Sequence, residues 1–185
     1  IRLIRPGYPV ETTQPFRTEY LNALAPFAAL RYMTVTNTNS FGPNSYLNPQ
    51  PELPNGNRTE WSDRQQPNVL PFSKATPWEQ VIDLANMTGA DAWINIPHDY
   101  VRQLAQLLKA RLQPEIKVYL EYSNELWHEG FTQGVYFREF TDHAPEAADI
   151  REGATVGDTY FSSIARPRQA ARRLLQCAEI FKQEL

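Results

Sequence analysis

The chain has 185 residues, enough for one domain with a sizeable core, since chains near this length bury roughly 70% of the surface that they expose when unfolded. Its 18 basic and 21 acidic residues leave a net charge of −3, without the basic stripe that a nucleic-acid backbone requires. No apolar run approaches the roughly 20 residues of a membrane-spanning helix. We therefore expect a single domain over residues 1–185, with neither a nucleic acid nor a membrane as its partner.

The N-terminal part of the chain alternates strand-like and helix-like segments. Residues 1–5 form a short alternating strand that a Pro-Gly pair stops. Residues 16–30 carry apolar side chains at intervals of three and four, which is the period of a helix. Residues 30–35 are again strand-like. Residues 36–76 are rich in Asn, Pro, Gln and Ser and predict a long loop.

The same alternation continues through the middle of the chain. Residues 76–88 predict a helix, with Thr76 as the expected N-cap and Gly89 as the residue that stops it. Residues 92–96 read as a buried strand that a proline closes. Residues 100–112 place their leucines on one stripe and predict an amphipathic helix.

The last strand and helix complete a repeating pattern. Residues 118–123 predict a fourth strand, and residues 169–185 a fourth helix after an irregular region over 128–167. Cys177, the single cysteine, lies in that helix, cannot form an internal disulfide and is expected to be a small buried apolar group. Four strand–helix units predict an α/β fold with a parallel sheet, and both long loops follow strands, where such folds bind ligands. An open doubly wound sheet and a barrel both fit this pattern.

The most informative segment is the end of the fourth predicted strand, residues 118–127. Alternation along a strand sends the apolar side chains of this segment to one face and Tyr119, Glu121, Ser123 and Glu125 to the other. Because a carboxylate is costly to bury without partners, repeated acidic residues on one face suggest a cavity that faces a ligand. The alternative is that Glu121 and Glu125 are solvated or salt-bridged edge residues.

The pattern Glu-Tyr-Ser-Asn-Glu-Leu-Trp at residues 121–127 resembles the end of the fourth strand in the clan-A-like superfamily of retaining (β/α)8 glycoside hydrolases. The resemblance implies that Glu125 is the general acid/base that protonates the glycosidic oxygen. It also implies that the Asn124 amide binds a sugar hydroxyl and that Trp127 forms a wall of the sugar site. A carbohydrate is then the expected substrate.

The same resemblance implies two further substrate-binding residues. His98, near the end of the third predicted strand, would line the sugar site, and Arg31, on the second, would orient the nucleophile. The alternative for His98 is a cap on the helix that begins near Tyr100. No compact metal-ligand spacing such as His-Glu-x-x-His occurs, and no Gly-rich phosphate loop is present, so we expect neither a metal nor a cofactor.

Aromatic residues stand among amides in the first long loop. Tyr46 and Trp61 could stack on sugar rings while neighbouring Asn and Gln side chains bind hydroxyls, which would make this loop one wall of an oligosaccharide cleft. The alternative is that these aromatic side chains pin the loop to the domain.

Four strand–helix units are half of a (β/α)8 barrel, which needs eight units and typically about 250 residues. The superfamily's nucleophile, a glutamate on the seventh strand, would then lie beyond Leu185 or on a second chain that completes the barrel. We expect the first half of a barrel, in an extracellular or periplasmic protein that cleaves polysaccharides or oligosaccharides. The alternatives are a non-catalytic carbohydrate-binding domain on the same scaffold and a doubly wound α/β interaction module.

Overall fold

The computed structural model describes residues 6–9, 11–40, 61–68, 75–96, 100–154 and 164–185 of the chain. Its centre is a parallel sheet of three strands, β1 (Ala29–Arg31), β2 (Asp91–Ile96) and β3 (Val118–Tyr122), in the spatial order β1-β2-β3. The α/β class and the parallel sheet predicted from the sequence are confirmed. The strand predicted at residues 1–5 lies outside the described residues.

The two faces of the sheet differ in burial, and β2 shows the difference most clearly. Ala92, Ile94 and Ile96 are at most 2% exposed, whereas Trp93, which points to the opposite face, is 42% exposed. Tyr119, the partner of Trp93 in the β2–β3 register, is 47% exposed. One face of the sheet is therefore packed, and the other presents aromatic and charged side chains.

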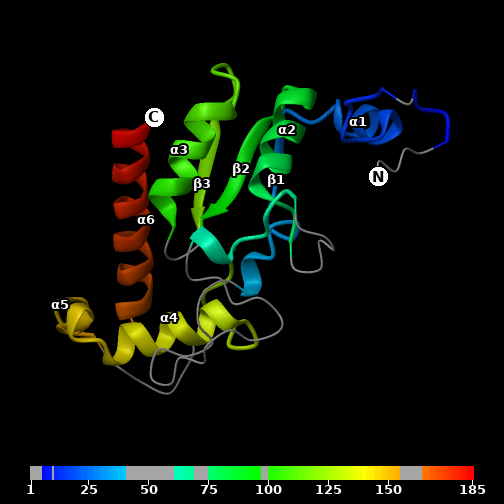
Figure 1. Cartoon of the computed structure of the whole chain (residues 1–185). Helices are drawn as coiled ribbons and strands as arrows, with labels where there is room; N and C mark the ends of the chain where they lie inside the picture. Colours follow the sequence, from blue (N-terminus) through cyan, green and yellow to red (C-terminus); the bar gives the residue numbers. More distant parts are fainter. Residues whose placement is uncertain (1–5, 10, 41–60, 69–74, 97–99, 155–163) are drawn as a thin grey trace.

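Three helices cover the packed face. The helix α2 (Trp78–Thr88) connects β1 to β2, α3 (Val101–Arg111) connects β2 to β3, and α6 (Ala165–Glu184) packs beside α3 and β3 (Figure 1). The apolar face of each helix packs against the sheet, so the three helices form one core with the buried face of β2. The fully buried members of that core include Ile82, Ala85, Ile94, Leu104, Ala105 and Cys177. Burial also raises the pKa of the Cys177 thiol.

The region over residues 128–167, predicted to be irregular, contains helices instead. It holds α4 (Thr132–His143), the 3-10 turn η3 (Pro145–Ala147) and α5 (Ala148–Arg151). The buried side of α4 includes Gln133, Phe137 and Thr141, spaced four residues apart. Because two of these three are polar, the helical period is invisible to a hydrophobicity pattern. The helix lies beyond the carboxyl ends of the strands (Figure 1).

Several element boundaries also differ from the prediction. The first helix, α1 (Thr18–Leu24), is shorter than residues 16–30, since Pro26 has no backbone N–H with which to continue it. The N-cap of α2 is Pro77 rather than Thr76, and its side chain makes no capping hydrogen bond. Gly89 ends α2 in the left-handed conformation with φ 68°, as predicted. No helix in the described part of the chain is both long and apolar enough to cross a membrane.

Candidate functional site

The carboxyl ends of the two outer strands are joined by a side-chain hydrogen bond. Arg31, the last residue of β1, donates from Nη2 to Oδ1 of Asn124 at 2.9 Å, and Asn124 lies two residues after β3. Two residues that the sequence proposed separately are therefore in direct contact. Since a guanidinium only donates hydrogen bonds, this contact also fixes which end of the Asn124 amide faces Arg31.

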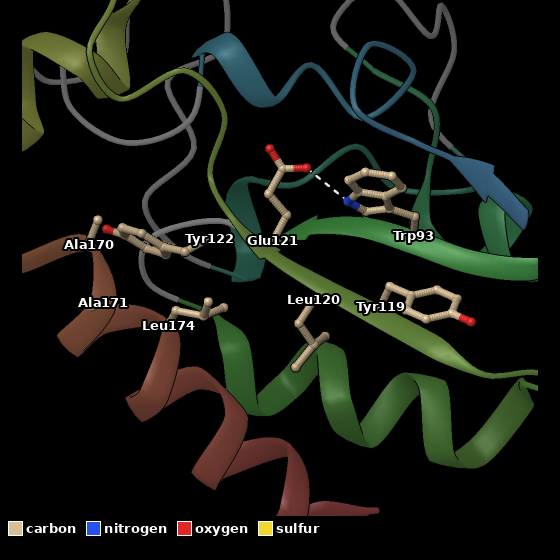
Figure 2. Close-up of a pocket in the computed structure, with 8 residues that line it drawn as sticks. All are labelled: Trp93, Tyr119, Leu120, Glu121, Tyr122, Ala170, Ala171 and Leu174. Carbon is tan, nitrogen blue, oxygen red and sulfur yellow. Dashed lines mark hydrogen bonds between the residues drawn. The ribbon is translucent and has the colours of Figure 1, made fainter. Parts of the chain in front are cut away.

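Arg31 is held in place by Glu121. Nε and Nη2 of Arg31 contact the Glu121 carboxylate at 2.8–3.0 Å, and Trp93 Nε1 donates to Glu121 Oε2 at 2.8 Å. The guanidinium also lies over the Trp93 ring, 5.2 Å from its centroid. Figure 2 shows Trp93 and Glu121 on the side of the sheet away from α3 and α6. Both carboxylate oxygens of Glu121 therefore accept hydrogen bonds within the protein, and this partly exposed residue acts as a structural partner of Arg31.

Asn124 is 4% exposed and bonded at both ends of its amide. Its Nδ2 donates to Oδ1 of Asn39 at 2.9 Å, in the 3-10 turn η1 (Thr38–Ser40) that follows β1. Gln133, near the start of α4, donates from Nε2 to the same Asn39 oxygen at 3.2 Å and to the Asn124 carbonyl at 3.1 Å. Asn124 therefore links β1, η1 and α4 at one edge of the sheet.

The turn that carries Asn124 and Glu125 has an unusual backbone. Ser123 has φ 58° and Glu125 has φ 39°, both in the region that side chains other than glycine seldom adopt. On the β2 side, Asn95 Nδ2 donates to the Ser123 carbonyl at 2.6 Å, and the Ser123 N–H donates to the Ile96 carbonyl at 3.0 Å. Such a conformation persists only where surrounding contacts hold it.

The side chain of Glu125 is exposed, and within the described part of the chain it makes no hydrogen bond. Its backbone carbonyl accepts from the His128 N–H at 2.8 Å. The Trp127 ring is 51% exposed and lies 5.5 Å from the His128 ring. Gly134 fits the start of α4 against this turn, since a Cβ there would clash with the His128 carbonyl oxygen. The turn thus presents a carboxylate and an indole to solvent.

Trp61, proposed as a sugar-binding residue, is engaged by the protein. The Arg64 guanidinium lies 4.1 Å from the centroid of its ring, and the Tyr100 ring meets it edge-on at 5.3 Å. Arg64 is itself paired with the buried carboxylate of Glu79 on α2 at 2.7 Å. These contacts favour the role of a pin between the loop and the domain, and a sugar contact remains a prediction. Tyr46 and His98 lie outside the described residues.

A groove of about 460 Å³ runs along the outer edge of β3 (Figure 2). Its walls come from β3, from Trp93 and from three small or apolar residues of α6, namely Ala170, Ala171 and Leu174. No three His, Cys, Asp or Glu side chains gather around a possible metal position in the described ranges. Tyr32, which follows Arg31, is 3% exposed, and burial, with a smaller effect of Tyr20, raises the pKa of its hydroxyl. Tyr32 therefore stays protonated and is unsuited to act as a base.

The network contains residues that the sequence did not single out. Asn95 had a visible signal, because it is a lone amide in the otherwise apolar strand Ala-Trp-Ile-Asn-Ile, where a polar residue must find a partner. Asn39 and Gln133 had none, because each lies in a polar stretch where an amide is ordinary. Trp93 would have been found only by knowing which face of the sheet is covered.

The positive φ at Ser123 leads to a stability prediction. We expect Ser123→Gly to leave the free energy of unfolding unchanged or to raise it by about 0.5–1 kcal/mol, because glycine adopts this conformation without steric cost. Ser123→Val should lower it by about 2 kcal/mol. In the control Ser40→Gly, where φ is not positive, we expect a loss of about 0.5–1 kcal/mol. Urea unfolding measures all three, and equal losses in both glycine variants would contradict the strained turn.

The contacts of Trp61 lead to a second prediction. Trp61→Ala removes the packing against Tyr100 and the Arg64 contact, so it should lower the free energy of unfolding by about 2 kcal/mol. Trp127→Ala, which replaces the exposed indole, should change it by less than about 1 kcal/mol. Thermal and urea unfolding of both variants test this difference. A stable Trp61→Ala protein that binds oligosaccharide more weakly would instead support the sugar-binding role.

Comparisons with known proteins do not assign this chain to a family. No protein-family model, curated protein or solved structure gives a significant match to the chain. The chemistry of the residues gathered at the carboxyl edge of the sheet therefore carries the functional assignment.

Proposed function

We propose that this chain is part of a glycoside hydrolase that cleaves a polysaccharide or oligosaccharide, with Glu125 as the general acid/base. One observation carries the proposal. Asn124 is locked to Arg31 at the carboxyl edge of a parallel sheet, and the next residue presents an exposed carboxylate there. Ligands of parallel α/β folds bind at that edge, so the carboxylate lies where a substrate would be expected.

Each group in the turn has a role that fits its contacts. Glu125 would protonate the departing glycosidic oxygen and then take a proton from the attacking water. Asn124 donates one amide hydrogen to Asn39, which leaves a second hydrogen for a sugar hydroxyl. The exposed Trp127 ring would provide an apolar wall for the sugar.

A retaining mechanism also needs a nucleophile about 5–5.5 Å from the acid/base. Glu121 is unsuited to that role, because its carboxylate is held by the Arg31 guanidinium and by the Trp93 indole N–H. As the resemblance to the superfamily implies, we propose that the nucleophile comes from another segment, in the remainder of the same protein or in a second chain. Arg31, already fixed at this edge, would help to orient it.

The winding of the sheet supports half of a (β/α)8 barrel as the scaffold. The strands follow one another in chain order, and the helices that connect them lie on one face. A barrel is wound in this single sense throughout, and so is each half of a doubly wound sheet, so the strand order fits both and the resemblance to the superfamily favours the barrel. The opposite face exposes Trp93 and Tyr119, and in a closed barrel such side chains would fill the interior. No second described strand pairs with β1 or with β3.

We propose further that the enzyme needs no metal or organic cofactor and acts outside the cytoplasm, where polysaccharide substrates are found. The competing function is carbohydrate binding without catalysis. It would use the same aromatic and amide groups but would not depend on the acidity of Glu125.

The role of Glu125 predicts a selective loss of activity. In the complete protein, Glu125→Gln should lower the rate on substrates with poor leaving groups by about 10²–10⁴-fold, since the amide cannot donate the proton, and should leave sugar binding largely intact. Steady-state kinetics and calorimetric titration with an oligosaccharide measure the two properties. Glu115→Gln, an exposed glutamate before β3, is the matched control. Unchanged activity in Glu125→Gln would remove this residue from the mechanism.

The half-barrel predicts the behaviour of the 185-residue chain alone. It should fail to hydrolyse an aryl glycoside, because a double displacement needs two carboxylates on opposite sides of one anomeric carbon. It should also self-associate or aggregate through the outer edges of β1 and β3, with which no further strand pairs in the described part of the chain, and light scattering coupled to size-exclusion chromatography would detect this. A monodisperse monomer that turns over an aryl glycoside, with activity lost in Glu125→Gln, would contradict both expectations.

A further inference from the structure

We propose that Asn95 and Gln133 are positioning residues that clamp the turn over residues 123–125 and thereby aim the Glu125 carboxylate. This inference rests on the proposed function and adds to it two residues that do not touch the sugar. Asn95 comes from β2 and Gln133 from α4. The turn is therefore held from two elements that are far apart in the chain.

The clamp consists of two hydrogen bonds to consecutive backbone carbonyls. Asn95 Nδ2 donates to the Ser123 carbonyl at 2.6 Å, and Gln133 Nε2 donates to the Asn124 carbonyl at 3.1 Å. These two carbonyls belong to the peptide groups on either side of Asn124, and the second peptide leads directly into Glu125. The His128 N–H holds the following peptide through the Glu125 carbonyl at 2.8 Å, and the three hydrogen bonds together set the direction in which the Glu125 side chain leaves the backbone.

The burial of the two amides shows what they contribute. Asn95 is 0% exposed and Gln133 is 5% exposed, and each turns its N–H₂ group toward a carbonyl, which can only accept. Within the described residues, Asn95 Oδ1 and Gln133 Oε1 have no hydrogen-bond partner. Burying an amide oxygen without a hydrogen-bond partner costs desolvation free energy, which an apolar side chain of the same size would avoid. What both side chains contribute is therefore the hydrogen bond that each N–H₂ group donates to the turn.

The turn needs this support because its backbone is strained. Ser123 and Glu125 both have positive φ, so the turn without its clamp would relax toward ordinary conformations and move the carboxylate. A general acid must lie within hydrogen-bond reach of the oxygen that it protonates. A displacement of about 1 Å at such a group can lower the rate by 10²-fold.

The test uses the complete protein and near-isosteric apolar variants, Gln133→Met and Asn95→Leu. Each should lower kcat by about 10–100-fold on an alkyl glycoside, whose leaving group needs a proton, with KM changed less than about threefold. On a dinitrophenyl glycoside, whose leaving group departs unprotonated, kcat/KM reports only the step that forms the glycosyl-enzyme, so both variants should keep kcat/KM within about threefold of the parent. Gln169→Met is the matched control, because Gln169 is a similarly buried amide on α6, at 3% exposure.

Three outcomes would overturn the clamp. The first is that Gln133→Met and Asn95→Leu keep the kcat of Gln169→Met on the alkyl glycoside. The second is an equal loss of kcat/KM on both substrates, and the third is failure of both variants to fold while Gln169→Met folds, which would make the amides purely structural. Glu125→Gln is measured in parallel. If that variant keeps its activity, the proposed function fails; if it alone loses activity, only the clamp fails.

Discussion

The hydrogen bond between the Arg31 guanidinium and the Asn124 side chain is the interaction on which the arrangement of this site depends. It spans the sheet from the end of β1 to the turn after β3, across β2. Glu121 and Trp93 keep the guanidinium in place from the open face of the sheet. Because Arg31 and Glu121 remain about one-third exposed and solvent screens their attraction, their pairing matters more as a geometric constraint than as a source of stability.

The polar side chains at the carboxyl edge of the sheet are of two kinds, those engaged in hydrogen bonds within the protein and those open to solvent. Arg31, Glu121 and Asn124 use their hydrogen-bonding capacity largely on one another and on neighbouring amides. Glu125, one residue further along, has an exposed side chain on a strained backbone. A carboxylate on a fixed backbone that is open to solvent can exchange a proton with a ligand, whereas one whose oxygens are engaged cannot do so without breaking its contacts.

The two faces of the sheet differ in what covers them. On one face, α2, α3 and α6 bury the apolar side chains of β2 and supply the core. On the other, Trp93 and Tyr119 remain more than 40% exposed beside Glu121. An exposed aromatic surface next to strand edges that no other described strand covers is a surface that further strands could extend over. The half-barrel proposal therefore depends on a sheet that is covered on one face, whereas the catalytic proposal depends on the contacts of Asn124 at its carboxyl edge.

The sequence by itself determined the α/β class, the parallel strands β2 and β3, the helix stop at Gly89 and the position of Asn124 and Glu125 at a strand end. These features follow from local periodicity and turn chemistry, which neighbouring residues express. Only the tertiary structure decided that Arg31 contacts Asn124, that Trp61 packs against Tyr100, and that residues 132–143 form a helix. The partners in those contacts lie far apart in the chain, and the buried side of α4 is partly polar, so side-chain pairing in three dimensions had to be known first.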